Sequence, residues 1–217
     1  MIKAIIFDMD GLMIDSEKIS YKCYKAILNR YGYSFTLDDY IKDYPGKPLI
    51  ASLEFINEKY HLNYDVQEQF EYFHQLEYQF IENEGVQLKK GLLELLHYLK
   101  ENNYQTIIAS SSHQERAETL LKAHHIFHYF DDTVYGKEVK RGKPFPDIFL
   151  KACEKLNIQA NEALVLEDSE AGIQAAYDAG IPVICIPDLK YPQQEYIDKT
   201  EAVLQSLKDV ISYIQKL

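Results

Sequence analysis

Apolar residues along this chain follow two rhythms, one typical of buried strands and the other of helices that face a core. Short apolar runs predict strands buried on both faces, as in parallel sheets. Longer stretches with apolar residues three and four apart predict amphipathic helices. The predicted strands occupy residues 2–7, 106–109, 133–135, 163–166 and 183–186, and we expect the fifth to be the last. Helices are predicted between them, for example over 114–123 and 148–156, and at the C-terminal end.

An all-helical stretch interrupts this alternation directly after the first strand. It shows helical patterns over about 16–31, 48–60 and 66–83 and no convincing strand. The alternation elsewhere implies a parallel sheet with helices on both faces. The expected fold is therefore α/β, with a Rossmann-like parallel sheet core and an inserted all-helical domain. We expect residues 1–15 and 84–217 to form the core and residues 16–83 the helical domain.

Composition and charge narrow the classes of partner. The 217 residues are 47% hydrophobic and 26% charged, which is ordinary for a globular protein. A formal net charge of −11 argues against nucleic acid or an anionic membrane as partner, and no apolar run is long enough to span a bilayer. Cys23, Cys153 and Cys185 lie far apart in apolar patterns, which favours buried thiols over a disulfide. Without a signal-peptide pattern, the expected location is the cytoplasm.

Two carboxylates follow the first predicted strand. Asp8 and Asp10 are two residues apart, so in an extended segment their side chains point the same way. Gly11 then allows the backbone to turn sharply. Like charges at the end of an apolar strand repel each other, so they indicate a bound cation or a reaction. The alternative is an acidic strand end that only caps the following segment.

Polar side chains also follow other predicted strands. Ser110, Ser111 and Ser112 end the second strand, and Glu167 and Asp168 end the fourth. Lys143 lies on a further loop. Each has a plain alternative, because serines and carboxylates cap helices and most loop lysines are solvated. Ligands of open parallel sheets bind at the carboxyl ends of the strands, so we expect these groups to converge.

Such a set of groups suits phosphoryl transfer. Carboxylate oxygens hold Mg²⁺, and a helix N-terminus with a serine hydroxyl binds phosphoryl oxygens. A lysine neutralises their charge. One carboxylate is then left to act as nucleophile and another as general acid and base.

Four stretches of the chain resemble the four motifs of the haloacid dehalogenase superfamily. They are residues 8–12, 110–112, 142–147 and 167–173, in the family's order and spacing. The nearest branch resembles β-phosphoglucomutase and sugar-phosphate phosphatases with a small helical cap. The resemblance implies a phosphate-ester enzyme with Mg²⁺ as cofactor and a cap over 16–83 that closes over the substrate and selects it.

The resemblance also implies a role for each matched residue. Asp8 would be the nucleophile that forms an aspartyl-phosphate, and Asp10 the general acid and base. The metal site would be formed by Asp8, the backbone carbonyl of Asp10, Glu167 and Asp168. Ser110, Ser111 and Lys143 would bind the phosphoryl group. Asp10 separates this chain from the family's dehalogenases, which lack an aspartate there.

Three functions remain open, and we favour a phosphatase of a small phosphorylated metabolite, a sugar phosphate in particular. The second is a β-phosphoglucomutase-like mutase, whose family members carry a cap histidine where this chain has Ser20 and a cap arginine near Leu49. Lys47 could replace that arginine but lacks its bidentate fork. The third is a phosphometabolite-binding protein without turnover. We expect a monomer.

Overall fold

The computed structural model describes all 217 residues, which divide into two compact units. The first unit comprises Met1–Ile14 and Leu88–Leu217, and the second comprises Asp15–Gln87. The first, called the core unit below, contains all of the strands. The second, called the helical unit, contains only helices and loops.

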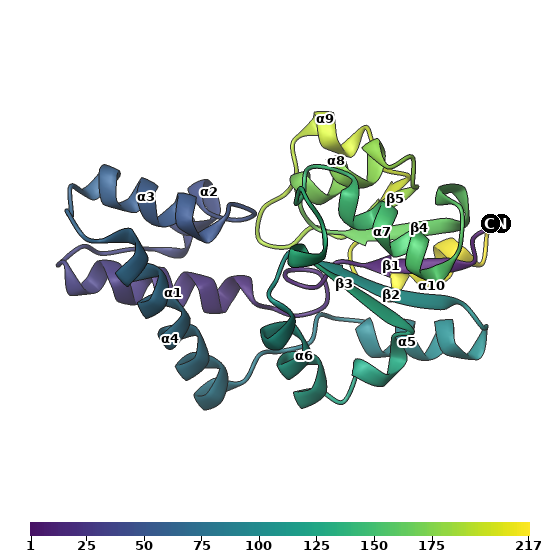
Figure 1. The fold of residues 1–217 in the computed structure, drawn as a ribbon, viewed down its shortest axis with the longest axis horizontal. Helices are drawn as coiled ribbons and strands as arrows, with labels where there is room; N and C mark the ends of the chain where they lie inside the picture. Colours follow the sequence, from purple (N-terminus) through teal and green to yellow (C-terminus); the bar gives the residue numbers. More distant parts are fainter. The chain divides into compact units, whose positions relative to one another are not determined.

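The core unit is built on one six-stranded sheet in which every neighbouring pair is parallel (Figure 1). The strand order is β3-β2-β1-β4-β5-β6. The strands are β1 (Ala4–Phe7), β2 (Gln105–Ser110), β3 (Asp132–Tyr135), β4 (Ala163–Glu167), β5 (Val183–Cys185) and β6 (Ala202–Val203). The expectation that the fifth strand is the last was wrong, because β6 adds one more at the edge. Its two residues are too few to show a hydrophobic period.

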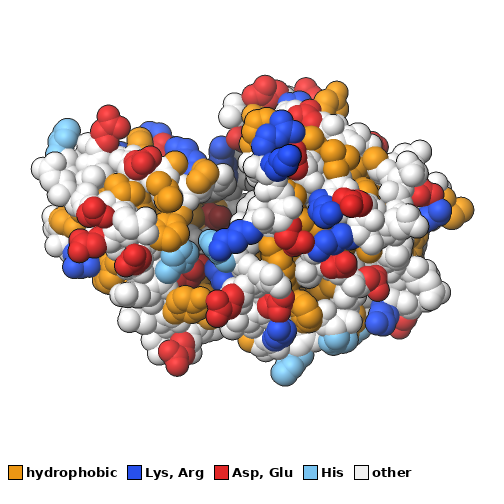
Figure 2. Space-filling view, viewed as in Figure 1, with side chains coloured by type: hydrophobic (Ala, Val, Ile, Leu, Met, Phe, Trp, Pro, Cys, Tyr) orange, Lys and Arg blue, Asp and Glu red, His pale blue; other side chains and the backbone are white.

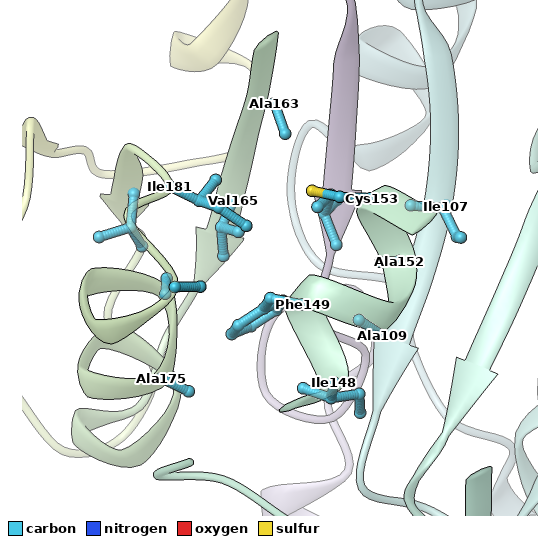
Figure 3. Close-up of a cluster of buried hydrophobic side chains, with 14 of the residues drawn as sticks. Ile107, Ala109, Ile148, Phe149, Ala152, Cys153, Ala163, Val165, Ala175 and Ile181 are labelled. Carbon is cyan, nitrogen blue, oxygen red and sulfur yellow. The ribbon is translucent and has the colours of Figure 1, made fainter. Parts of the chain in front are cut away.

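Both faces of the sheet are buried, as the unbroken apolar runs predicted. One face carries Ala4 and Ile6 of β1 and packs against Ile173 of α8 (Glu170–Asp178) and Phe149 of α7 (Asp147–Leu156). Figure 3 shows Phe149 within this cluster. Ile5 and Phe7 point to the opposite side and are also fully buried. α5 (Leu92–Glu101) contacts β2 and α10 (Asp209–Ile214). Because β1 is packed on both faces, the position of its last residue, Phe7, is fixed. The residues that follow Phe7 therefore begin from a fixed point.

Helices connect the strands of the core unit. They are α5 (Leu92–Glu101), α6 (Gln114–Ala123), α7 (Asp147–Leu156), α8 (Glu170–Asp178), α9 (Gln194–Ile197) and α10 (Asp209–Ile214). Three short 3-10 turns add to them: η1 (Phe127–Tyr129), η2 (Gly136–Glu138) and η3 (Ala160–Glu162). In the view of Figure 1, both chain ends appear at the same end of this unit. The predicted α/β sheet core is confirmed.

The helical unit packs four helices around aromatic side chains. They are α1 (Glu17–Arg30), α2 (Leu37–Asp43), α3 (Leu49–Tyr60) and α4 (Val66–Glu84). α4 contacts both α1 and α3, and the ring of Tyr24 lies 4.9 Å from that of Phe73. The pattern did not predict α2, which has seven residues. Its capping box, formed by Thr36 and Asp39, was nevertheless a readable signal.

Acidic and basic side chains are interspersed over the face seen in Figure 2. No helix is long and apolar enough to cross a bilayer. All three cysteines are buried and none is in a disulfide, as the sequence predicted.

Candidate active site

The carboxyl ends of β1 and β4 place Asp8 beside Glu167. Phe7 pairs with Leu166 in the sheet, so Asp8 and Glu167, which follow them, lie at the same level. The amide N–H of Asp8 donates to the carbonyl of Leu166 at 3.1 Å. The chain connections diverge between β1 and β4, which is the switch point where open parallel sheets bind ligands.

Lys143 lies between these two carboxylates. Its Nζ forms an ion pair with Asp8 Oδ1 and lies 2.6 Å from Glu167 Oε1. The side chain is only 7% exposed, and Nζ lies 4.9 Å from the centre of the Phe149 ring. The interpretation of Lys143 as a solvated loop lysine was therefore wrong.

Burial and charge act against each other in this cluster. Burial is the main cause that raises the pKa of Asp8, to about 7; Lys143 opposes the rise and Glu167 adds to it. Burial lowers the pKa of Lys143, but the carboxylates of Asp8 and Glu167 outweigh it and hold that pKa above its ordinary value. Lys143 is therefore a cation at neutral pH.

Glu167 is held by its own loop. Its Oε2 accepts hydrogen bonds from the amide N–H groups of Asp168 and Ser169, at 2.9 and 3.0 Å, and from the Ser169 hydroxyl at 3.0 Å. Ser169 in turn caps α8 by accepting from the N–H of Gly172. These bonds leave Oε1 to face Lys143, so one fully buried carboxylate joins the helix cap to the lysine.

Asp8, Glu167 and Asp168 together could hold a metal ion. One carboxylate oxygen from each lies within 4.8 Å of the others. Oxygens that share a Mg²⁺ ion at about 2.1 Å lie at most about 4.2 Å apart, so small side-chain rotations would close the site. Gly11 makes room for Asp168, because a Cβ there would come within 2.3 Å of Asp168 Oδ2. An all-oxygen donor set in a glycine-lined space fits a hard divalent cation.

The side chain of Asp10 belongs to a different set of contacts. Arg116 Nη1 donates to Asp10 Oδ1 at 2.9 Å, and the hydroxyl of Ser112 donates to Asp10 Oδ2. Sequence reasoning assigned no role to Arg116 and none to Ser112 in particular. The sequence shows that Ser112 and Arg116 are four residues apart. It does not show their contact with Asp10, because Asp10 is more than a hundred residues away in the chain.

The predicted phosphate-binding serines differ in their surroundings. Ser110 is buried, and its Oγ accepts from the N–H of Ser112 at 3.1 Å, whereas the side chain of Ser111 is exposed. None of the three serines caps α6, whose N-cap residue is His113. The alternative that these serines only cap the helix was therefore wrong, and Ser112 turns its hydroxyl to Asp10 instead.

The comparison with protein families agrees with this geometry. A model of haloacid dehalogenase-like hydrolases matches residues 5–186, which include every candidate site residue. The chain belongs to this family. The resemblance read from the four motifs is thereby confirmed.

Relatives of this haloacid dehalogenase-like protein span most of its length. A phosphorylated carbohydrates phosphatase from Thermotoga maritima is 32% identical over 179 residues, covering 82% of each chain. The (DL)-glycerol-3-phosphatase 1 of Arabidopsis thaliana is 32% identical over 219 residues, covering 94% of this chain and 70% of that protein. The crystal structure of β-phosphoglucomutase from Clostridium difficile superimposes with a TM-score of 0.80 at 25% identity, covering 100% of this chain and 96% of that one.

Proposed function

We propose that this protein is a Mg²⁺-dependent phosphatase that hydrolyses a small phosphorylated metabolite of the sugar-phosphate class through an aspartyl-phosphate. The observation that carries the proposal is the convergence of Asp8, Lys143 and Glu167 at the switch point of the sheet, with Asp10 held separately by its own partners. The names of the relatives support the substrate class.

Asp8 and Asp10 would divide the chemistry. An Asp8 carboxylate oxygen attacks phosphorus, the bond from phosphorus to the ester oxygen breaks, and that oxygen takes a proton from Asp10. Water then attacks the phosphorus of the aspartyl-phosphate and gives a proton to Asp10. The bond between phosphorus and Asp8 breaks, which releases phosphate and restores both carboxyl groups.

The remaining site residues bind and neutralise charge. Lys143 and the hydroxyl of Ser110 would hold phosphoryl oxygens, with the exposed Ser111 directly after the strand. Asp8, Asp168, Glu167 and the backbone carbonyl of Asp10 would hold Mg²⁺. That ion, when bound, supplies positive charge that offsets the repulsion between the phosphate and the carboxylates.

The helical unit is proposed to be the cap that selects the substrate. Its separate fold, joined to the core unit by two short connections, supports this role. The buried cysteines, none of which is in a disulfide, support a cytoplasmic location. We also propose that the protein acts as a monomer, which light scattering on the purified protein would test.

A mutase is the second candidate, because the fold resembles that of a β-phosphoglucomutase. A mutase must return the phosphoryl group to a sugar before water removes it. The cap serine at position 20, where mutases of the family carry histidine, argues for hydrolysis.

A substrate panel tests the proposal. The purified protein with Mg²⁺ is assayed for phosphate release from hexose, pentose, glycerol and nucleoside monophosphates and from p-nitrophenyl phosphate. Isomerisation of β-glucose 1-phosphate with a bisphosphate primer is measured beside it. We expect hydrolysis that EDTA and Asp8→Asn abolish. Isomerisation faster than hydrolysis would favour the mutase, and no turnover of any ester would overturn both.

A further inference from the structure

We propose that Arg116 and Ser112 are positioning residues that fix the carboxylate of Asp10 for its work as general acid and base. The inference rests on the proposed function, because it needs Asp10 to transfer protons. Arg116 Nη1 lies 2.9 Å from Asp10 Oδ1 and 3.3 Å from Oδ2. The same nitrogen lies 3.0 Å from the hydroxyl oxygen of Ser112, which itself donates to Asp10 Oδ2.

These three side chains form a closed hydrogen-bonded triangle. A serine hydroxyl has one proton and two lone pairs, so Ser112 can accept from Arg116 while it donates to Asp10. Both carboxylate oxygens of Asp10 are thus contacted, from a segment more than a hundred residues away. Contact at both oxygens restricts rotation of the carboxylate as well as its position.

The place of Arg116 in its helix supports a directed role. Arg116 lies in the first turn of α6, where the helix dipole favours anions and disfavours cations. Its side chain is only 13% exposed. A cation that is mostly removed from water at an unfavourable helix end needs a specific counter-charge, and Asp10 supplies one. Ala117 and Leu121, both fully buried, anchor the same helix against the core.

Positioning matters at Asp10 because it lies beyond the end of β1, where its backbone forms only an isolated bridge with Ile14. Gly11 follows with a φ of +84°, and the side chain of Asp10 is 28% exposed. An aspartate side chain has two rotatable bonds, so its carboxylate needs contacts from other residues to hold one orientation. Proton transfer requires the carboxyl oxygen within hydrogen-bond reach of the reacting oxygen, and a displacement of about 1 Å can cost about a hundredfold in rate.

The test separates the two half-reactions with p-nitrophenyl phosphate in a stopped-flow spectrometer. p-Nitrophenolate leaves as an anion without needing a proton, so formation of the aspartyl-phosphate is insensitive to Asp10. Attack by water on the aspartyl-phosphate still needs Asp10 as base. For Arg116→Met and Ser112→Ala, we expect a burst of about one p-nitrophenolate per site. The steady-state rate of p-nitrophenolate release after the burst should be about 10–100-fold below that of the wild type.

The same variants are then compared on an alkyl phosphate from the substrate panel, whose leaving oxygen needs a proton. We expect kcat to fall about 10–100-fold and KM to stay within about threefold. Ser112→Thr, which keeps the hydroxyl, should restore most of the rate, and Arg116→Lys a part of it. Lys122→Met is the matched control, because Lys122 is on the same helix but pairs with Glu118 at the surface.

Three results would overturn the inference. The first is a kcat of Arg116→Met and Ser112→Ala on the alkyl phosphate within twofold of wild type. The second is a raised KM with unchanged kcat on that substrate. The third is loss of the p-nitrophenolate burst in a variant that still folds. The second would make Arg116 a substrate-binding residue, and the third would make the triangle part of the nucleophile's support. If Arg116→Met does not fold, Ser112→Ala and its threonine rescue decide the matter. A wild-type enzyme with neither burst nor turnover would instead refute the proposed function itself.

Discussion

Gly172 lies against the carboxylate of Glu167 so closely that no other residue fits there. A Cβ at Gly172 would come within 1.8 Å of Glu167 Oε1 and 1.9 Å of its carboxyl carbon. The carboxylate therefore occupies the space that a side chain in the first turn of α8 would fill. This contact fixes the glutamate that faces Lys143.

Gly172→Ala should destabilise the protein by about 2–4 kcal/mol. Overpacking and the displaced hydrogen bonds of a buried carboxylate outweigh the roughly 1 kcal/mol that alanine gains over glycine in a helix. Urea unfolding of the metal-free protein measures the difference. Gly142→Ala is the control, since nothing lies within 4 Å of its Cβ position, and it should change stability by less than about 0.5 kcal/mol. Equal stability of the two variants would contradict the role of this contact.

Gly11→Ala should weaken binding of a divalent cation. The substitution places a Cβ within 2.3 Å of Asp168 Oδ2, so Asp168 must move away from its present place. We expect the affinity for Mg²⁺ or Mn²⁺, measured by calorimetry, to fall about 10–100-fold. Gly180→Ala separates this from backbone strain, because Gly180 also has a positive φ, +68°, but open space around it. The prediction fails if both variants bind the cation as wild type does.

Lys143→Met should leave Asp8 and Glu167 as buried carboxylates without the cation between them. Removing one partner of a buried ion pair costs about 3–5 kcal/mol, and methionine keeps most of the contact with Phe149. Chemical denaturation at pH 7.5 without metal measures this loss, and added Mg²⁺ should recover part of it. Lys151→Met, which breaks a surface pair with Glu154, should cost less than about 1 kcal/mol. A comparable small loss for Lys143→Met would contradict the buried pairing.

Asp8→Asn should stabilise the metal-free protein at neutral pH while abolishing turnover. Burial raises the pKa of Asp8 from 3.8 to about 7, so the folded protein binds this proton more tightly than the unfolded chain. The stability that Asp8 contributes is full below about pH 4 and is lost as the pH rises towards 7.

The gain of Asp8→Asn over wild type should therefore grow as the pH rises from 4 to 7, because the wild-type protein loses the stability of its bound proton over that range. Urea unfolding in EDTA at several pH values measures it. Mg²⁺ should shrink or reverse the gain, because the wild-type carboxylate binds the ion. A difference that does not change with pH would show that Asp8 is not the group responsible.

Local pattern predicted much of this fold. The buried runs before Asp8 and Glu167 mark β1 and β4, and the predicted helix over 114–123 has the bounds of α6. The pattern missed α2 and β6, because seven and two residues carry too little periodicity to stand out from a loop. Only the capping box before α2 was available as a sign of it.

The sequence by itself determined which residues end the parallel strands, and therefore that Asp8, Ser110, Glu167 and Asp168 lie along one edge of the sheet. Parallel strands must present their carboxyl ends together, so this part follows from hydrophobic pattern alone. Tertiary structure decided which of these groups touch. Lys143 came to lie between Asp8 and Glu167, and Asp10 was turned towards Arg116 and Ser112. Those contacts join residues far apart in the chain, and side-chain packing, which no local pattern records, sets their distances.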